Sequence, residues 1–202
     1  VIFITNLYPS KEMPYKGSFV KNVHDEFSNA GIDVRLIKLE YVGISKWLKL
    51  LSFMNFYIKS FLTAVFAKNG DVFYIHYASH SSLGVLLASF FRNLKIVTNV
   101  HGSDVLPDVS YGKYSSLVNY TLSKLILPKS TVVVSPSEYF KSIIHEKYRI
   151  SLNSIFVSPS GGVNSTIFFP KNKMSTNQNI KFGYIGRIEA AKGVFDLISA
   201  YV

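Results

Sequence analysis

Two residues that suit ligand chemistry follow short apolar runs of the sequence. Gly17 lies in the loop after the first run, residues 1–5, and His101 directly follows the run at residues 96–100. A glycine in such a loop lets a phosphate group approach backbone N–H groups, and the dipole of the following helix favours the negative charge. A histidine exchanges hydrogen bonds with sugar hydroxyls near neutral pH. Each residue alone also fits a structural role, as a turn glycine or a packed histidine.

A second pair of candidates lies near the end of the chain. Arg187 and Lys192 stand between a predicted strand at residues 181–185 and a predicted helix at residues 194–202. An arginine and a lysine at such a turn can hold a diphosphate from two sides, by bidentate hydrogen bonds and as a point charge. Taken in isolation, the two side chains equally fit solvated surface charge.

Two further residues have both a structural and a functional interpretation. Asp104 follows His101 closely and suits the cap of the next helix or contact with a ligand. His76 ends an apolar run and fits either a satisfied structural histidine or the lining of a cleft. The spaced pair His76 and His80 lacks a third ligand, and the chain has no Asp-x-Asp and no cysteine, so no metal site is expected.

The elements that position these residues alternate between strands and helices. Short runs rich in Val and Ile are typical of strands that are covered on both faces. They occur at residues 1–5, 34–39, 72–75, 96–100, 132–134 and 155–157. Helical patterns separate them, and Ser135 with Glu138 fits a capping box for one helix. The alternation predicts an α/β fold, a doubly wound, Rossmann-like parallel sheet of about six or seven strands.

The composition changes after this first domain, for which we expect residues 1–170. Residues 171–179 are polar and predict a linker. Residues 180–202 would form the first strand and helix of a second, truncated Rossmann-like domain, because one strand and one helix cannot bury their own faces.

The helical stretch at residues 44–68 has an unusual pattern. Its apolar stripe is expected to face the core and comprises Trp47, Leu51, Met54, Ile58, Phe61 and Val65. This leaves Phe53 and Phe56 on the outer face beside Lys46 and Lys49. Aromatic rings beside lysines suit an anionic membrane interface, whereas a neighbouring element could equally cover them.

The net charge of +10 favours anionic partners such as phosphorylated ligands, nucleic acid or a membrane surface. Because the lysines and arginines are scattered, a nucleic-acid-binding module is the weaker alternative. The start of the chain reads as a buried strand and has no signal-peptide features, which favours a cytoplasmic location.

In order, the motifs K-G-S-F from Lys16, H-G-S-D from His101, V-S-P-S-E from Val134, P-S-G-G-V-N from Pro159 and G-R-x-x-x-x-K-G from Gly186 resemble the retaining GT-B glycosyltransferases of family 4. One departure is Asn164, where that family usually has aspartate. A non-catalytic subunit and a GT-B epimerase or phosphorylase remain alternatives.

The resemblance implies a glycosyltransferase that moves a hexose from a UDP- or GDP-sugar to a glycan or lipid-linked acceptor, with retention and without a metal or another cofactor. Gly17, Arg187 and Lys192 would contact the donor diphosphate, and His101 would lie near the reaction centre. His76 and Asp104 would lie on the acceptor side. The family's paired glutamates would follow residue 202, so this chain alone is expected to be inactive. Surface polysaccharide synthesis at the inner face of the membrane would fit.

Overall fold

A computed structural model describes residues 1–41, 45–106, 112–159, 165–166, 168–169, 182–186, 188 and 192–201. The chain divides into two compact units, Val1–Gly162 and Val163–Val202, which are considered separately below.

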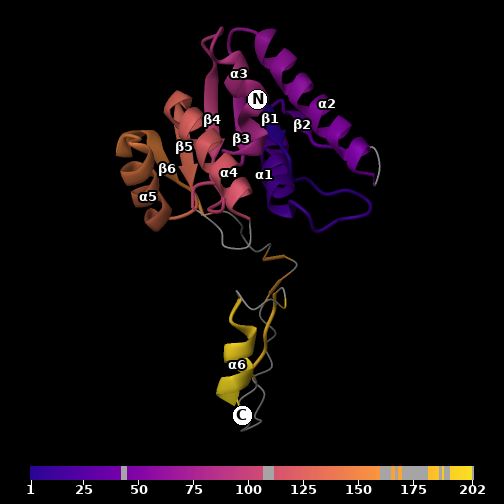
Figure 1. The fold of residues 1–202 in the computed structure, drawn as a ribbon, viewed down its shortest axis with the longest axis vertical. Coiled ribbons are helices and arrows are strands. Elements are labelled where there is room, and N and C mark those ends of the chain that lie inside the picture. Colours follow the sequence, from indigo (N-terminus) through magenta and orange to yellow (C-terminus); the bar gives the residue numbers. More distant parts are fainter. Residues whose placement is uncertain are drawn as a thin grey trace. The chain divides into compact units, whose positions relative to one another are not determined.

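The first unit contains a six-stranded parallel sheet, which confirms the predicted α/β fold class (Figure 1). The strands follow one another in the order β2-β1-β3-β4-β5-β6, so the direction of winding reverses between β1 and β3. Open α/β sheets bind ligands beside the carboxyl ends of the strands at such a reversal. The strands are β1 (Ile2–Thr5), β2 (Arg35–Lys38), β3 (Val72–His76), β4 (Lys95–Asn99), β5 (Val132–Ser135) and β6 (Ile155–Val157).

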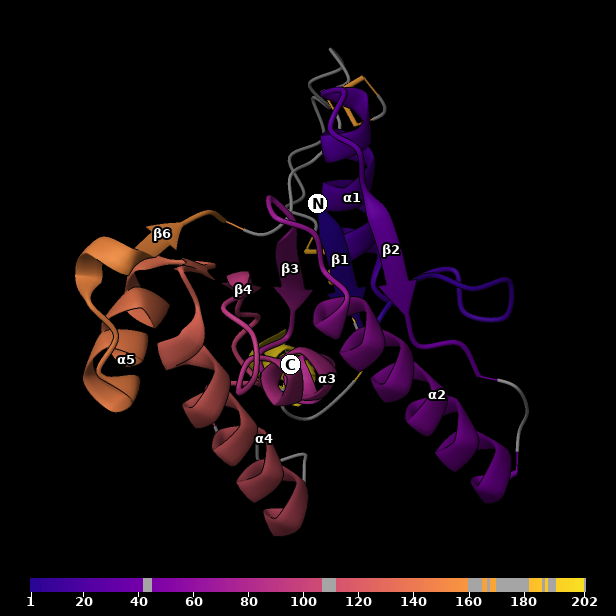
Figure 2. The same ribbon diagram turned by 90° about the horizontal axis from the view of Figure 1, so that it is seen from above.

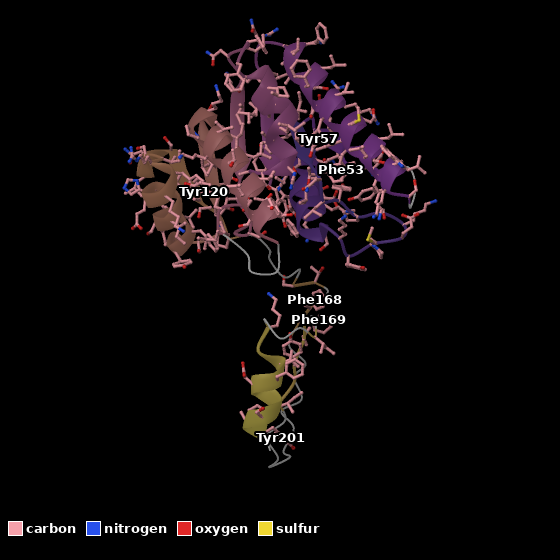
Figure 3. The ribbon with its side chains drawn as sticks, viewed as in Figure 1. Phe53, Tyr57, Tyr120, Phe168, Phe169 and Tyr201 are labelled. Carbon is pink, nitrogen blue, oxygen red and sulfur yellow. The ribbon has the colours of Figure 1, made fainter. Side chains whose placement is uncertain are left out.

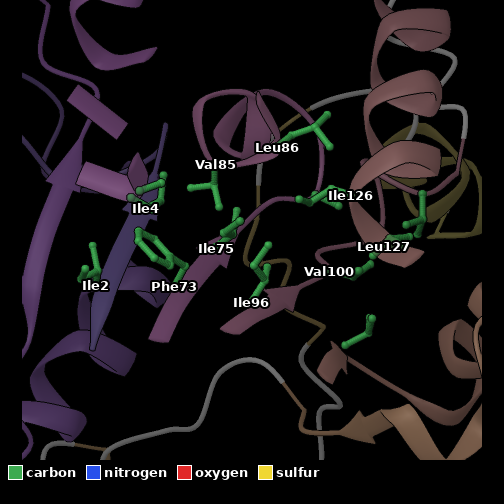
Figure 4. Close-up of a cluster of buried hydrophobic side chains, with 14 of the residues drawn as sticks. Ile2, Ile4, Phe73, Ile75, Val85, Leu86, Ile96, Val100, Ile126 and Leu127 are labelled. Atoms are coloured by element: carbon green, nitrogen blue, oxygen red, sulfur yellow. The ribbon is translucent and has the colours of Figure 1, made fainter. Parts of the chain in front are cut away.

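Helices cover both faces of this sheet. Figure 2 shows α1 on one face and α2, α3 and α4 on the other. The helices of this unit are α1 (Ser18–Asn29), α2 (Lys46–Val65), α3 (Leu83–Ala88), α4 (Lys113–Ile126) and α5 (Glu138–Tyr148). Ile2, Ile4, Phe73 and Ile75 alternate along β1 and β3 and belong to the buried core, part of which is drawn in Figure 4.

The register of the central strands aligns their carboxyl ends. Thr5 pairs with His76 on the neighbouring strand, and His76 pairs with Asn99 on the next. The residues that leave these three strands therefore emerge at one edge of the sheet. Gly17 and His101 follow β1 and β4, so both belong to this carboxyl edge.

Helix α2 turns a different face to the core from the one expected. Phe56 is buried, and Phe53, which is labelled in Figure 3, is partly buried against the core. The assignment of these two phenylalanines to a membrane surface is therefore wrong. Most of the stripe expected in the core is instead on the surface: Trp47, Leu51, Met54 and Ile58 are exposed.

Close packing between α2 and α3 explains this orientation. The buried positions of α2 include Ser52, Ser60 and Ala64, whose small side chains let another helix approach. A Cβ atom at Gly84 of α3 would collide with Ser60 Oγ and come within 2.8 Å of the Tyr57 carbonyl oxygen. The Ser60 hydroxyl donates to that same carbonyl at 3.0 Å, so its burial leaves no donor unpaired.

One smaller expectation also changes. Helix α5 begins at Glu138, with Ser137 as its N-cap, rather than with Ser135. The Ser137 hydroxyl accepts from the backbone N–H of Phe140 at 3.3 Å, whereas Ser135 donates to the Ser137 carbonyl at 2.9 Å. A single serine beside the helix start thus satisfies a free N–H group, and no reciprocal capping box is needed.

The second unit contains helix α6 (Val194–Tyr201), as expected for that segment. The strand predicted at residues 181–185 is not formed over the described residues 182–185. A strand gains its stability from a neighbour with which to pair, and no described residue pairs with this segment. The expected linker at residues 171–179 and the residue Asn164 lie outside the described residues.

The contact between α2 and α3 leads to a first prediction. Gly84→Ala should destabilise the first unit by about 1–3 kcal/mol, because its methyl group has no space beside the α2 backbone. The gain in helix propensity, at most about 1 kcal/mol, would offset only part of this cost. Urea unfolding of the chain measures the difference. Leu87→Ala, at an exposed position of α3, is the matched control and should cost much less. Equal stability of Gly84→Ala and the parent chain would contradict the close packing.

Candidate functional site

The loop after β1 is held in place at both ends. The Asn6 backbone N–H donates to Ser81 Oγ at 2.9 Å, and the Ser81 hydroxyl donates to Asn6 Oδ1 at 3.0 Å. Ser81 belongs to the segment after β3, so these bonds tie together the exits of the two strands that flank the reversal. The start of the loop is therefore fixed at the place where a ligand is expected.

Gly17 closes the same loop against the end of β1. Its φ of 70° lies in the left-handed region, and a Cβ atom there would be 2.5 Å from the Leu7 carbonyl carbon. Only glycine combines this backbone conformation with this close approach. Helix α1 starts directly afterwards, so its N-terminal N–H groups lie beside the exit of β1, as phosphate recognition requires.

His101 is the centre of a small cluster of rings at the carboxyl edge. The Phe19 ring, from the first turn of α1, lies 4.8 Å from it between centroids, and the Tyr77 ring lies 4.5 Å from it. The structure thus brings together His101, which follows β4, and the start of α1, which follows β1. Tyr77 was not anticipated from sequence. It has a φ of 70°, a strained value for a non-glycine residue that its neighbours hold in place.

His76 lies beneath His101 and is fully buried. Nδ1 of His76 is 3.3 Å from Nε2 of His101, so one ring donates to the other. Nε2 of His76 is buried and has no hydrogen-bond partner. An orphaned buried N–H group is rarer than an unpaired acceptor, which favours the tautomer in which His76 donates from Nδ1. His101 would then carry its own proton on Nδ1 and use Nε2 as the acceptor.

Burial makes both imidazoles weak bases. It lowers the pKa of His101 to about 4 and that of His76 to about 3. For His76, electrostatic repulsion from His101 lowers the pKa further. Both rings are therefore neutral at pH 7. This pair can give and take hydrogen bonds, but it supplies no positive charge for a phosphate group.

Asp104 anchors the cluster from within. Its two carboxylate oxygens accept from the backbone N–H of Ala78 at 2.8 Å and from that of His101 at 3.0 Å. Burial raises the pKa of Asp104, and these hydrogen bonds oppose the shift. Both oxygens are used inside the protein, and the described start of α4 has no side-chain cap, so the expectation that Asp104 caps the next helix is wrong. Its place on the acceptor side stays a prediction. Its buried backbone contacts could not be read from the sequence.

The remaining predicted donor-binding residues, Arg187 and Lys192, belong to the second unit of the chain. Lys192 lies just before α6 in the second unit and is exposed. Arg187 lies outside the described residues. Within the described part of the chain, no group of three or more His, Asp or Glu side chains is placed to hold a metal ion.

The fold is that of a Rossmann-like α/β domain, with a candidate ligand site at the carboxyl edge of its parallel sheet. A family model described as Glycosyltransferase Family 4 matches residues 17–161, more than half of the chain. The chain therefore belongs to glycosyltransferase family 4.

Comparison with solved structures shows a similarity to the UDP-GlcNAc 2-epimerase from Methanocaldococcus jannaschii, with a TM-score of 0.43 and 13% sequence identity. The match covers 77% of this chain and 44% of the epimerase chain, so this chain spans less than half of that protein. No curated protein matches the sequence.

The neutral histidine pair leads to a second prediction, on stability and pH. Between about pH 6.5 and pH 3 the unfolded chain binds a proton at His76 that the folded chain does not, so stability falls as the pH falls. His76→Phe should remove this contribution, and the loss of unfolding free energy from pH 7 to pH 4.5 should shrink by about 2 kcal/mol.

Urea unfolding at the two pH values measures this difference. The pKa of Asp104 is raised rather than lowered, but this residue is present in both proteins, so its contribution to the pH dependence cancels in the comparison. Tyr74→Phe is the matched control, since it keeps the ring and removes only the hydroxyl group, which accepts from Asn99 at 3.1 Å. The same pH dependence in His76→Phe and the parent chain would show that His76 is not neutral in the folded state.

Proposed function

We propose that the whole protein containing this chain transfers a sugar from a UDP- or GDP-sugar donor to a glycan or lipid-linked acceptor. The transfer retains the anomeric configuration and needs neither a catalytic metal nor another cofactor. The family match carries this proposal, because residues 17–161 include both Gly17 and His101. The contact of Phe19 with His101 supports it, since it joins a phosphate-compatible helix start to a hydrogen-bonding centre.

The roles of the residues follow from their chemistry. The bond between the sugar and the diphosphate breaks in the transfer, and negative charge develops on the leaving diphosphate. Arg187 and Lys192 would stabilise that charge. The backbone at Gly17 suits contact with a phosphate group of the donor. Neutral His101, with its proton on Nδ1, would donate a hydrogen bond to the transferred sugar or to the acceptor. His76 would fix the tautomer of His101 by donating a hydrogen bond from Nδ1 to Nε2 of His101.

A location on the inner face of the membrane, in the assembly of a surface polysaccharide, extends this proposal. Its support comes from the face of α2 opposite to Phe53 and Phe56. Trp47, Leu51, Met54, Ile58 and Leu62 form an exposed apolar stripe at helical spacing. The helix also contains three lysines and no acidic residue. Such a helix suits the plane of an anionic bilayer interface. None of the described helices is long and apolar enough to span a bilayer.

The third prediction tests the transfer. The whole protein, given a panel of UDP- and GDP-sugars with candidate acceptors, should release nucleotide only when an acceptor is present. Lys192→Ala should lower kcat/KM for the donor by at least tenfold, about 1.4 kcal/mol of transition-state stabilisation. Lys147→Ala, an exposed lysine of α5, is the control. Conversion of the donor sugar without an acceptor would instead identify an epimerase, and unchanged kinetics would remove Lys192 from the site.

The fourth prediction tests the membrane surface with the single tryptophan of the chain, Trp47, which is 77% exposed. Vesicles rich in phosphatidylglycerol should shift its fluorescence to the blue, and added salt should weaken the binding. Leu51→Asp should reduce partitioning at least tenfold, whereas Leu117→Asp, an exposed leucine of α4, should leave it unchanged. Equal effects of the two variants, or equal binding to neutral vesicles, would contradict this membrane surface.

A further inference from the structure

A hollow lies beside the candidate site, at the carboxyl ends of β1 and β2. Its volume is about 830 Å³, within the range of small-molecule sites. The loop between β1 and α1, the exit of β2 and the first turn of α2 line it. Asn6, whose backbone is tied to Ser81, forms part of its wall. The hollow therefore begins at the same strand exit as the site around Gly17, although the roles given above to Gly17 and His101 do not use it.

Four lysines line this hollow: Lys11, Lys16, Lys38 and Lys49. Two glutamates oppose them. Glu40 lies 3.2 Å from the ammonium group of Lys38 and neutralises it. Glu12 is fully exposed, and hydrogen bonds from its own backbone N–H and from Ser10 lower the pKa of its carboxyl. Three lysines then face one remaining glutamate, which leaves the hollow positively charged.

Two tyrosines hold lysine ammonium groups toward the hollow. The Lys16 ammonium lies 5.1 Å from the centroid of the Tyr41 ring, and the Lys38 ammonium lies 5.3 Å from that of Tyr8. These cation–π contacts restrict two otherwise flexible side chains. Both tyrosines also line the hollow, so an apolar ring face and a hydroxyl lie beside the positive charge. This combination suits a ligand that carries a phosphate on a sugar or on an isoprenoid, more than an isolated inorganic anion.

We propose that this hollow binds the phosphate or diphosphate group of the acceptor. The inference rests on the proposed transfer reaction and deepens it, since it assigns to the acceptor a phosphate that the lysines recognise as point charges. Such a phosphate belongs either to a soluble sugar phosphate or to a lipid-linked diphosphate. Lys49 lies on α2, the helix with the exposed apolar stripe, so an acceptor embedded in a membrane could reach the hollow from that side.

The test is a titration of the ¹⁵N-labelled chain, followed by amide chemical shifts. The probes are pyrophosphate, glucose 1-phosphate and farnesyl diphosphate. All three should shift amides in residues 8–16 and 38–41. The tightest of them identifies the source of the phosphate: glucose 1-phosphate for a soluble acceptor, and farnesyl diphosphate for a lipid-linked one.

The triple variant Lys11→Gln/Lys16→Gln/Lys49→Gln should weaken this binding at least tenfold. Its matched control is Lys21→Gln/Lys95→Gln/Lys147→Gln, which removes the same charge outside the hollow and should change the affinity less than twofold. An equal loss in the two variants, or shifts scattered over the surface, would overturn the proposal. UDP as a fourth probe carries a diphosphate as well, but it should bind the hollow less tightly than glucose 1-phosphate or farnesyl diphosphate does. Tightest binding of UDP would assign the hollow to the donor instead.

This result is separate from that of the transfer assay. Absence of phosphate binding in a protein that transfers sugar would reject the hollow alone. Phosphate binding in a protein without transfer would keep the hollow as an anion site and reject the enzyme.

Discussion

The buried carboxylate of Asp104 is the constraint on which the candidate site depends. A carboxylate without solvent is stable only when its oxygens accept hydrogen bonds, and the two oxygens of Asp104 accept from Ala78 and His101. These acceptors fix the backbone that leaves β3 relative to the backbone that leaves β4. The rings of His76 and His101 meet because the strand exits are joined in this way. Loss of either hydrogen bond would remove a favourable partner from a buried carboxyl group, so the same contacts support the geometry of the histidine pair and the stability of the domain.

The carboxyl edge of the sheet combines a neutral region at the buried histidines with a positively charged region at the hollow. The centre at His76 and His101 is neutral, because desolvation disfavours the protonated ring. The neutral rings can orient a sugar hydroxyl by hydrogen bonds, and they do not attract a phosphate group away from the lysines. Positive charge lies instead at the rim, where Lys11, Lys16 and Lys49 line the neighbouring hollow. A substrate that carries both hydroxyl and phosphate groups would be oriented by this separation, with its anionic part at the rim and its reacting part toward the centre.

The parts of this fold that sequence predicts well are those in which one residue class decides the outcome. Runs rich in Val and Ile predicted the positions of the six described strands, because central strands covered on both faces are largely apolar. Strand β2 is less buried, and two of its four residues are charged. The placement of Gly17 and His101 at one edge followed from the parallel sheet. The orientation of α2 did not follow, because its buried face includes Ser52 and Ser60 and its exposed face carries larger apolar residues. The hollow could not be predicted from the sequence either, since Tyr8 and Tyr41 line it together only in the folded chain.

The two faces of α2 have a common explanation. Close approach to Gly84 requires a small side chain at Ser60, whereas several larger apolar residues of the helix lie on its exposed face, a surface of the kind that often marks an interaction site. A protein partner would be expected to bring acidic residues to meet the lysines of this helix, whereas an anionic bilayer supplies negative charge and apolar depth together. Lys49 belongs both to this helix and to the hollow. An acceptor that approached along such a bilayer would therefore meet the hollow on its way to the strand exits, and its phosphate would be bound before its hydroxyl reached His101.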